Sequence, residues 1–147
     1  MAALLLAVQG HGRFKGLPAR PTLARWVRLA LERDAEITLR FVGAAEGRRL
    51  NRDYRGRDYA TNVLTFDYAT APAVHADIVL CVPVIRREAR EQRKRYRDHL
   101  AHLVVHGVLH AHGYDHDRAA PARKMEAREV RILARLGLAD PYRAPAG

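Results

Sequence analysis

The chain has 147 residues, 48% of them hydrophobic, which is enough for one core and favours no second domain. Its 26 Lys and Arg residues against 16 Asp and Glu give a net charge of +10, which favours a polyanionic partner. The single cysteine, Cys81, excludes an intramolecular disulfide and a cysteine-based zinc cluster. The apolar stretch 1–8 is too short to span a membrane and has no basic residues before it. We therefore expect one cytoplasmic domain, residues 1–147, with no membrane partner.

The predicted elements alternate between strands and helices along the chain. In order they are a strand within 1–8, a helix at 22–33 capped by Thr22, a strand at 37–42, a helix at 45–54, strands at 62–66 and 76–82, a helical stretch at 84–112, and a helix at 122–136 stopped by Gly137. Asp98 could cap a second helix and divide the long stretch in two. This order predicts an α+β fold: a single domain with a mixed β-sheet of about four strands packed by about five helices.

Six of the eight histidines fall between positions 99 and 116. On a helix, His106 and His110 share one face with their side-chain roots about 5 to 6 Å apart, so both imidazoles can bind one ion. His102 continues the stripe, but eight residues separate it from His110 by roughly 12 Å, too far for one small ion to bind all three. We therefore assign His102, like His99 and the outward-facing His112, to packing or to the surface.

A third ligand can come from the turn that follows this helix. Gly113 predicts a helix stop, after which the chain can fold back and direct His116 at the ion, with Asp115 or Asp117 as alternatives. Three histidines and no fourth protein ligand describe an open site, so we expect one divalent ion per chain, zinc by preference, at the central helix and the following turn.

Zinc peptidases carry His-Glu-x-x-His, with the glutamate as general base. Here Gly107 occupies the position of that glutamate, so a peptidase would lack its general base. The spacing of the two histidines still suits a metal ion. We also expect Gly107 to leave open space beside the ion.

The run 106–116, HGVLHAHGYDH, resembles the signature of the YbeY family of bacterial endoribonucleases. Similar stretches at 50–55, 61–66, 76–78 and 91–92 occur in the family's order, so that the resemblance covers about positions 36 to 137. It departs from the family pattern after Phe66, where an expected proline is absent. The resemblance implies a metal-dependent enzyme of ribosomal RNA maturation, including processing of the 16S 3' end, and of ribosome quality control. It also implies that Arg55 lies in the active cleft.

Two arginine-rich stretches, 48–57 and 86–97, carry much of the positive charge. Beside a hydrolytic metal site they favour phosphate binding, and the candidate substrate contacts are Arg52, Arg57, Arg93, Lys94 and Arg95. Tyr54 and Tyr59 could stack on bases of a single strand, but we favour core positions for both.

The predicted function is a metal-dependent endoribonuclease that prefers single-stranded RNA and associates with the ribosome or its small subunit. His106, His110 and His116 are the expected metal ligands, and Arg55 and His106 the expected catalytic residues, with Arg55 neutralising charge on the phosphate. Metal-activated water and the 2'-hydroxyl of the RNA are both candidate nucleophiles. Two alternatives remain: a zinc hydrolase of a small or peptide substrate, and a non-catalytic ribosome-binding module with a structural metal.

Overall fold

The computed structural model describes residues 2–114 and 119–143. The predicted ligand His116 and its alternatives Asp115 and Asp117 lie outside these ranges. In chain order the elements are β1 (Leu4–Gln9), the 3-10 helix η1 (His11–Arg13), α1 (Arg20–Ala30), β2 (Ala35–Val42), α2 (Ala44–Arg55), β3 (Val63–Ala69), β4 (Val74–Cys81), α3 (Val82–Glu91), α4 (Tyr96–Ala111) and α5 (Ala119–Arg135).

The four strands form one mixed sheet in the order β1-β2-β4-β3. β1, β2 and β4 run parallel, and β3 pairs with β4 in the antiparallel direction at one edge. A parallel pair needs a crossover, which α1 provides between β1 and β2. The expected α+β fold, with a four-stranded mixed sheet and five α-helices in the described residues, is confirmed.

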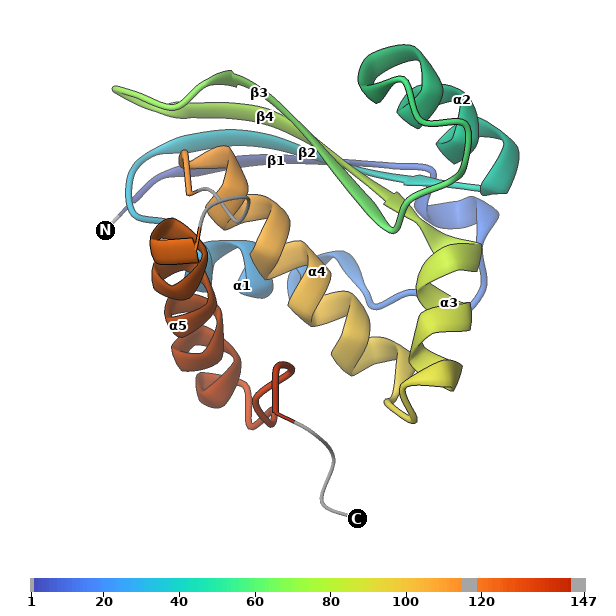
Figure 1. Ribbon diagram of the computed structural model, residues 1–147. Coiled ribbons are helices and arrows are strands. Elements are labelled where there is room, and N and C mark those ends of the chain that lie inside the picture. The colour runs from blue at the N-terminus through green and yellow to red at the C-terminus, as the bar shows by residue number, and fades with distance from the viewer. Residues whose placement is uncertain (1, 115–118, 144–147) are drawn as a thin grey trace.

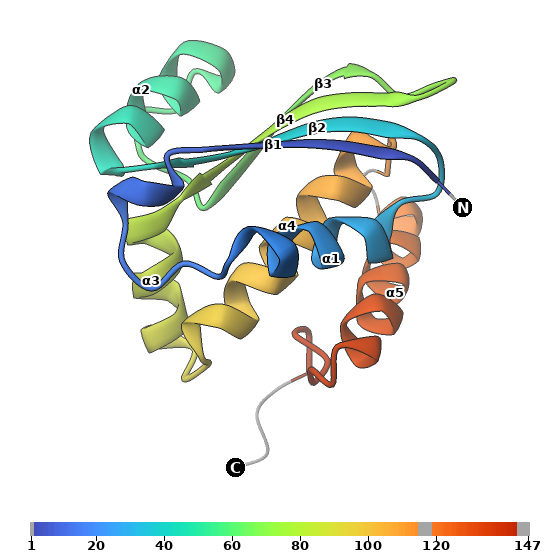
Figure 2. The same ribbon diagram turned by 180° about the vertical axis from the view of Figure 1, so that it is seen from behind.

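The helices are unequally divided between the two faces of the sheet. Figures 1 and 2 show α1, α4 and α5 below the sheet and α2 above one end of it, and no other helix of residues 2–114 and 119–143 lies over the upper face. The main core lies on the lower side, where α4 contacts β3, β4, α1, α3 and α5. A smaller apolar cluster that includes Leu64, Val79 and Cys81 lies under α2. Because α4 contacts so many elements, its position is set by the whole lower layer.

Gly107 lies inside the α4–sheet interface, so the expected open space beside the ion is not there. A Cβ added to Gly107 would lie 2.8 Å from Cγ2 of Ile78 on β4. Gly107 is therefore needed for the close approach of helix to sheet.

The expected helix caps at Thr22 and Asp98 are wrong. α1 begins at Arg20 with Ala19 as its N-cap residue, and Pro21 in its first turn favours this start through its fixed φ. α4 has Arg95 as its N-cap residue, and Asp98 lies within the first turn, where its charge complements the helix dipole.

The break between α3 and α4 was expected, but it falls earlier in the chain. Arg93 has a left-handed backbone (φ 54°), and the backbone N–H of Lys94 donates to the carbonyl of Ala89 at 2.9 Å. This is the geometry that closes a helix C-terminus.

The helix stop predicted at Gly113 is confirmed. α4 ends at Ala111, Gly113 has φ 99°, and the N–H of Tyr114 donates back to the carbonyl of Leu109 at 3.3 Å. The chain therefore turns immediately after the histidine stripe of α4. In the described ranges, no helix combines the length and apolar character that a membrane span requires.

Candidate metal centre

Glu129 on α5 is the buried charge around which the histidines of α4 are organised. It is fully buried (0% exposed) and accepts hydrogen bonds from Nδ1 of His106 at 2.5 Å and Nε2 of His102 at 3.0 Å. The Tyr142 hydroxyl donates to it as well. Burial by itself would raise the pKa of Glu129, but these hydrogen bonds lower it to about 2, so the carboxylate is ionised. Burial and the bond to Glu129 raise the pKa of Tyr142.

His102, His106 and Glu129 form a group that could hold a metal ion. One ligand atom from each lies within 4.8 Å of the other two. The sequence spacing places His102 in packing or at the surface and assigns no role to Glu129, whereas the structure brings both into this group. A signal for Glu129 was present, because this acid occupies the apolar stripe of its helix, between Met125 and Ile132. A charged residue in such a stripe is seldom buried without a partner.

A pocket of about 140 Å³ is also lined by His106, but not by His102 or Glu129. The residues that line it come from the C-terminal end of α2, the loop before β3, β3 itself and α4; they are Arg55, Thr61, Asn62, Val63, Thr65, His106 and His110. None of the described residues that line it is acidic. The bond from Nδ1 to Glu129 orients the His106 ring, so that an ion bound by His106 in this pocket would have to bind at Nε2. His106 thus belongs both to the group with Glu129 and to the lining of this pocket.

The structure brings Arg55, His106 and His110 together from helices far apart in the sequence. Arg55 is the last residue of α2, and Gly56 with φ 69° ends that helix. Buried Asn51 donates from its amide to the carbonyl of Tyr59 at 2.7 Å, which ties the following loop back to α2. This bond sets the position of Arg55 relative to the loop.

Asn62 is held on the pocket wall by two hydrogen bonds. Its Oδ1 accepts from the backbone N–H of Val63 at 2.6 Å, and its amide donates to Oε1 of Glu88 on α3 at 2.9 Å. The same Oε1 accepts from Nε2 of His99, which is 4% exposed. Burial lowers the pKa of His99. Of the two roles expected for His99, packing or the surface, the structure shows packing, and through Glu88 this histidine also supports the pocket.

The other predicted substrate contacts do not line this pocket. Arg52 lies on α2 beside Asp53, and Arg57 follows the helix and donates to the hydroxyl of Tyr59. Arg93, Lys94 and Arg95 line a separate hollow of about 280 Å³, next to His99 and His102. The core positions expected for Tyr54 and Tyr59 are wrong, because these side chains are 67% and 52% exposed.

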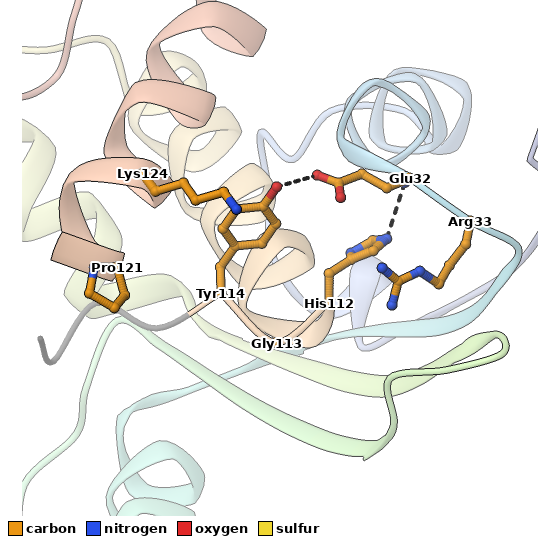
Figure 3. A pocket seen from close by; sticks show the side chains of 7 residues that line it. All are labelled: Glu32, Arg33, His112, Gly113, Tyr114, Pro121 and Lys124. Carbon is orange, nitrogen blue, oxygen red and sulfur yellow. Dashed lines mark hydrogen bonds between the residues drawn. The ribbon is translucent and has the colours of Figure 1, made fainter.

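A hollow of about 620 Å³ lies at the C-terminal end of α4, between the segment after α1 and the start of α5 (Figure 3). His112, which lines it, is buried, donates from Nδ1 to the carbonyl of Val108 at 2.8 Å, and accepts at Nε2 from the backbone N–H of Glu32 at 3.1 Å. Both ring nitrogens are used in these bonds, so of the two roles expected for His112, packing or the surface, the structure shows packing. The hydroxyl of Tyr114 donates to the Glu32 carboxylate at 2.6 Å.

The fold and the buried histidine–glutamate group define an α+β protein with a site that could hold a metal ion. A family model described as Endoribonuclease YbeY matches residues 20–137. Relatives with that name from Bordetella pertussis and Polaromonas naphthalenivorans are each 60% identical to this chain. The first alignment covers 96% of this chain and 97% of the relative, and the second covers 84% and 83%. The chain belongs to the Endoribonuclease YbeY family, as its resemblance indicated.

The fold also has a counterpart among solved structures. A solution structure of a protein from Thermotoga maritima aligns with a TM-score of 0.58 over 95% of this chain and 99% of that one. At 23% identity this likeness concerns the fold alone.

Proposed function

We propose that this chain is a metal-dependent endoribonuclease that cleaves single-stranded RNA in the pocket shared by Arg55, His106 and His110. The observation that carries the proposal is this convergence: a guanidinium and two imidazoles from α2 and α4 line one small pocket. Family membership supports cleavage of RNA, because the relatives are named endoribonucleases. The net charge of +10 supports a polyanionic substrate.

The ion is proposed to bind at Nε2 of His106 and at His110, with His116 as the third ligand. Two features of the described residues support this arrangement over the group at Glu129. A carboxylate that accepts the other ring N–H is the usual outer partner of a metal-binding histidine, and Glu129 meets His106 in that way. Glu129 also already accepts from His102 and Tyr142, and an ion at its oxygens would have to displace those bonds. We propose zinc, the ion that open three-histidine sites most often hold.

The chain's own residues would bind and orient the phosphodiester. Arg55 can pair with two non-bridging oxygens and offset the negative charge that develops during cleavage. Glu88 keeps Asn62 at the pocket wall, so that this side of the pocket keeps its shape when a substrate enters. A divalent ion in this pocket would supply Lewis-acid polarisation of the scissile phosphate.

The biological substrate is proposed to be ribosomal RNA, with 16S 3' end processing and ribosome quality control as the processes served. The ribosome or its small subunit is the proposed partner, and the cytoplasm the proposed compartment. Arg52 and Arg57 would contact phosphates near the pocket, and Arg93, Lys94 and Arg95 phosphates farther along the strand. Their separation into two places supports contact with an extended RNA rather than with a small substrate.

The test is cleavage of labelled single-stranded RNA by purified protein, with and without a chelator. We expect cleavage that the chelator abolishes and added zinc restores. The chemical ends of the product then identify the nucleophile, since attack by the 2'-hydroxyl leaves a cyclic phosphate. Hydrolysis of a peptide or small ester without RNA cleavage would support the small-substrate hydrolase. RNA binding without any cleavage would support the non-catalytic module.

A further inference from the structure

The proposed cleavage pocket continues around the free edge of the sheet. A second hollow, of about 320 Å³, shares Arg55 and Thr65 with the pocket and extends along β3 past Phe66 to Tyr68. β3 is the edge strand of the sheet, and no strand in the described part of the chain pairs with its outer side. A chain that leaves the pocket beside Arg55 can therefore pass over β3 to the upper face of the sheet.

A third hollow, of about 190 Å³, lies on that upper face. It shares Tyr54, Phe66 and Tyr68 with the second hollow and reaches Arg40 on β2 and Gln9 on β1. Figures 1 and 2 show that α2 covers only one end of this face, so the surface beside it is open. The three hollows follow one another from the pocket on α4 to the end of β1.

Two tyrosines along this surface are exposed yet held in place. Tyr54 is 67% exposed, and its ring meets Phe66 edge-on at a centroid distance of 4.6 Å. Tyr68 is 60% exposed; its hydroxyl donates to Asp77 at 2.8 Å, and its ring lies 5.0 Å from that of His75. A fixed, exposed aromatic ring binds a planar partner at low entropic cost, because little side-chain freedom remains to be lost.

The charges along the surface are arranged for a nucleic acid strand. At its far end three arginines surround one carboxylate: Arg40 pairs with Glu46, and Arg13 and Arg49 each lie 3.8 Å from it, which leaves an excess of two positive charges. Arg55 stands at the near end. The described acids lining the middle are Asp67 and Asp77. Phosphates are therefore favoured at the two ends and uncharged base faces between them.

We propose that Tyr54 and Tyr68 form a base-stacking subsite for single-stranded RNA that leaves the cleavage pocket over β3. This inference rests on the proposed function and adds to it the path of the strand. Unpaired bases can turn a face toward a tyrosine, whereas the bases of a duplex are stacked on each other. The subsite would thus account for a preference for single strands without reading sequence.

Tyr68 is the residue to test. Tyr54 directly precedes Arg55 in the chain, so a change at Tyr54 would also affect the residue that is proposed to act in cleavage. The probe is a fluorescent single-stranded DNA of about ten nucleotides, which keeps bases and phosphates but resists a ribonuclease, with an abasic oligomer of equal length as its partner. We expect Tyr68→Ala to weaken binding of the base-bearing strand about tenfold. Tyr68→Phe keeps the ring but loses the bond to Asp77, so it should bind the strand far more tightly than Tyr68→Ala does. Leu5→Ala, which removes a side chain 70% exposed on β1, is the control and should leave binding unchanged.

The abasic strand separates stacking from charge, and RNA cleavage separates this inference from the proposed function. Tyr68→Ala should bind the abasic strand as the unaltered protein does, and should raise KM for RNA while leaving kcat unchanged. Equal affinity of Tyr68→Ala and the unaltered protein for the base-bearing strand, with RNA still cleaved, would overturn the subsite alone. If Tyr68→Ala lost as much affinity for the abasic strand as for the base-bearing strand, the subsite would also be overturned. Failure of the unaltered protein to cleave RNA would remove the proposed function, and the subsite with it.

Discussion

Replacing Glu129 by glutamine tests whether this buried carboxylate holds His106 for the metal. The change keeps the shape of the side chain but removes its charge and turns one acceptor oxygen into a donor. Glu129 accepts from His102, His106 and Tyr142, so at least one of these bonds must be lost or reversed. The fall of its pKa from an ordinary 4.5 to about 2 corresponds to about 3 kcal/mol of stabilisation of the ionised form. The loss of one or two charge-assisted hydrogen bonds would lower the stability of the fold by about 2 to 4 kcal/mol, which agrees with the value obtained from the pKa.

We therefore expect Glu129→Gln to lower the free energy of unfolding by about 3 kcal/mol, measured by urea denaturation in the presence of a chelator. Zinc affinity, measured by competition with a chromophoric chelator, should fall about 10- to 100-fold, as when other outer partners of metal-binding histidines are removed. Glu126→Gln makes the same charge change three residues earlier on α5 and should leave zinc affinity unchanged. Unaltered zinc affinity in Glu129→Gln would refute the proposed orienting role of this carboxylate.

Three further predictions concern the ligands, the phosphate and the acid stability. Elemental analysis should find about one metal ion per chain. The His110→Ala variant should lose this ion, and the His102→Ala variant should keep it. Loss of the ion in His102→Ala but not in His110→Ala would place it in the group with Glu129. Arg55→Ala should keep the fold and the metal but cleave RNA about 100-fold more slowly, with only partial recovery in Arg55→Lys; an unchanged rate would exclude Arg55 from the chemistry. Although burial opposes its ionisation, hydrogen bonding, first of all from Tyr114, lowers the pKa of Glu32 below its ordinary 4.5. Glu32→Gln should therefore lower the free energy of unfolding at neutral pH. This difference from the unaltered protein should shrink as the pH falls below 4.5. Urea denaturation over this range checks the trend, and a difference that stayed constant far below pH 4.5 would contradict it.

Several features could be predicted from the sequence because they depend on residues close together in the chain. The spacing of His106 and His110 places them on one face of α4, and both line the same pocket. Gly113 ends that helix through its own backbone conformation. The α+β class followed from the order of periodic segments, since the period of apolar residues reflects the local geometry of a helix or a strand.

The partners of these residues could not be predicted in that way. Glu129 meets His106 only because α5 packs beside α4, and 23 positions separate the two residues. Gly107 turned out to face Ile78 rather than the ion, because the sheet determines which side of α4 is buried. Tyr54 was expected in the core but is 67% exposed, because it lies on α2, which covers only one end of the sheet.

The sequence by itself determined the helix with its histidine stripe, the turn after it, the excess of positive charge and the family. Only the tertiary structure decided which ring nitrogen of His106 meets a carboxylate, which arginine lies in the pocket, and which tyrosines are exposed. The physical reason is that the former depend on backbone geometry and composition over a few residues. The latter depend on how α2, α4, α5 and β3 pack together, and contacts between distant segments are set by the whole core rather than by any local pattern.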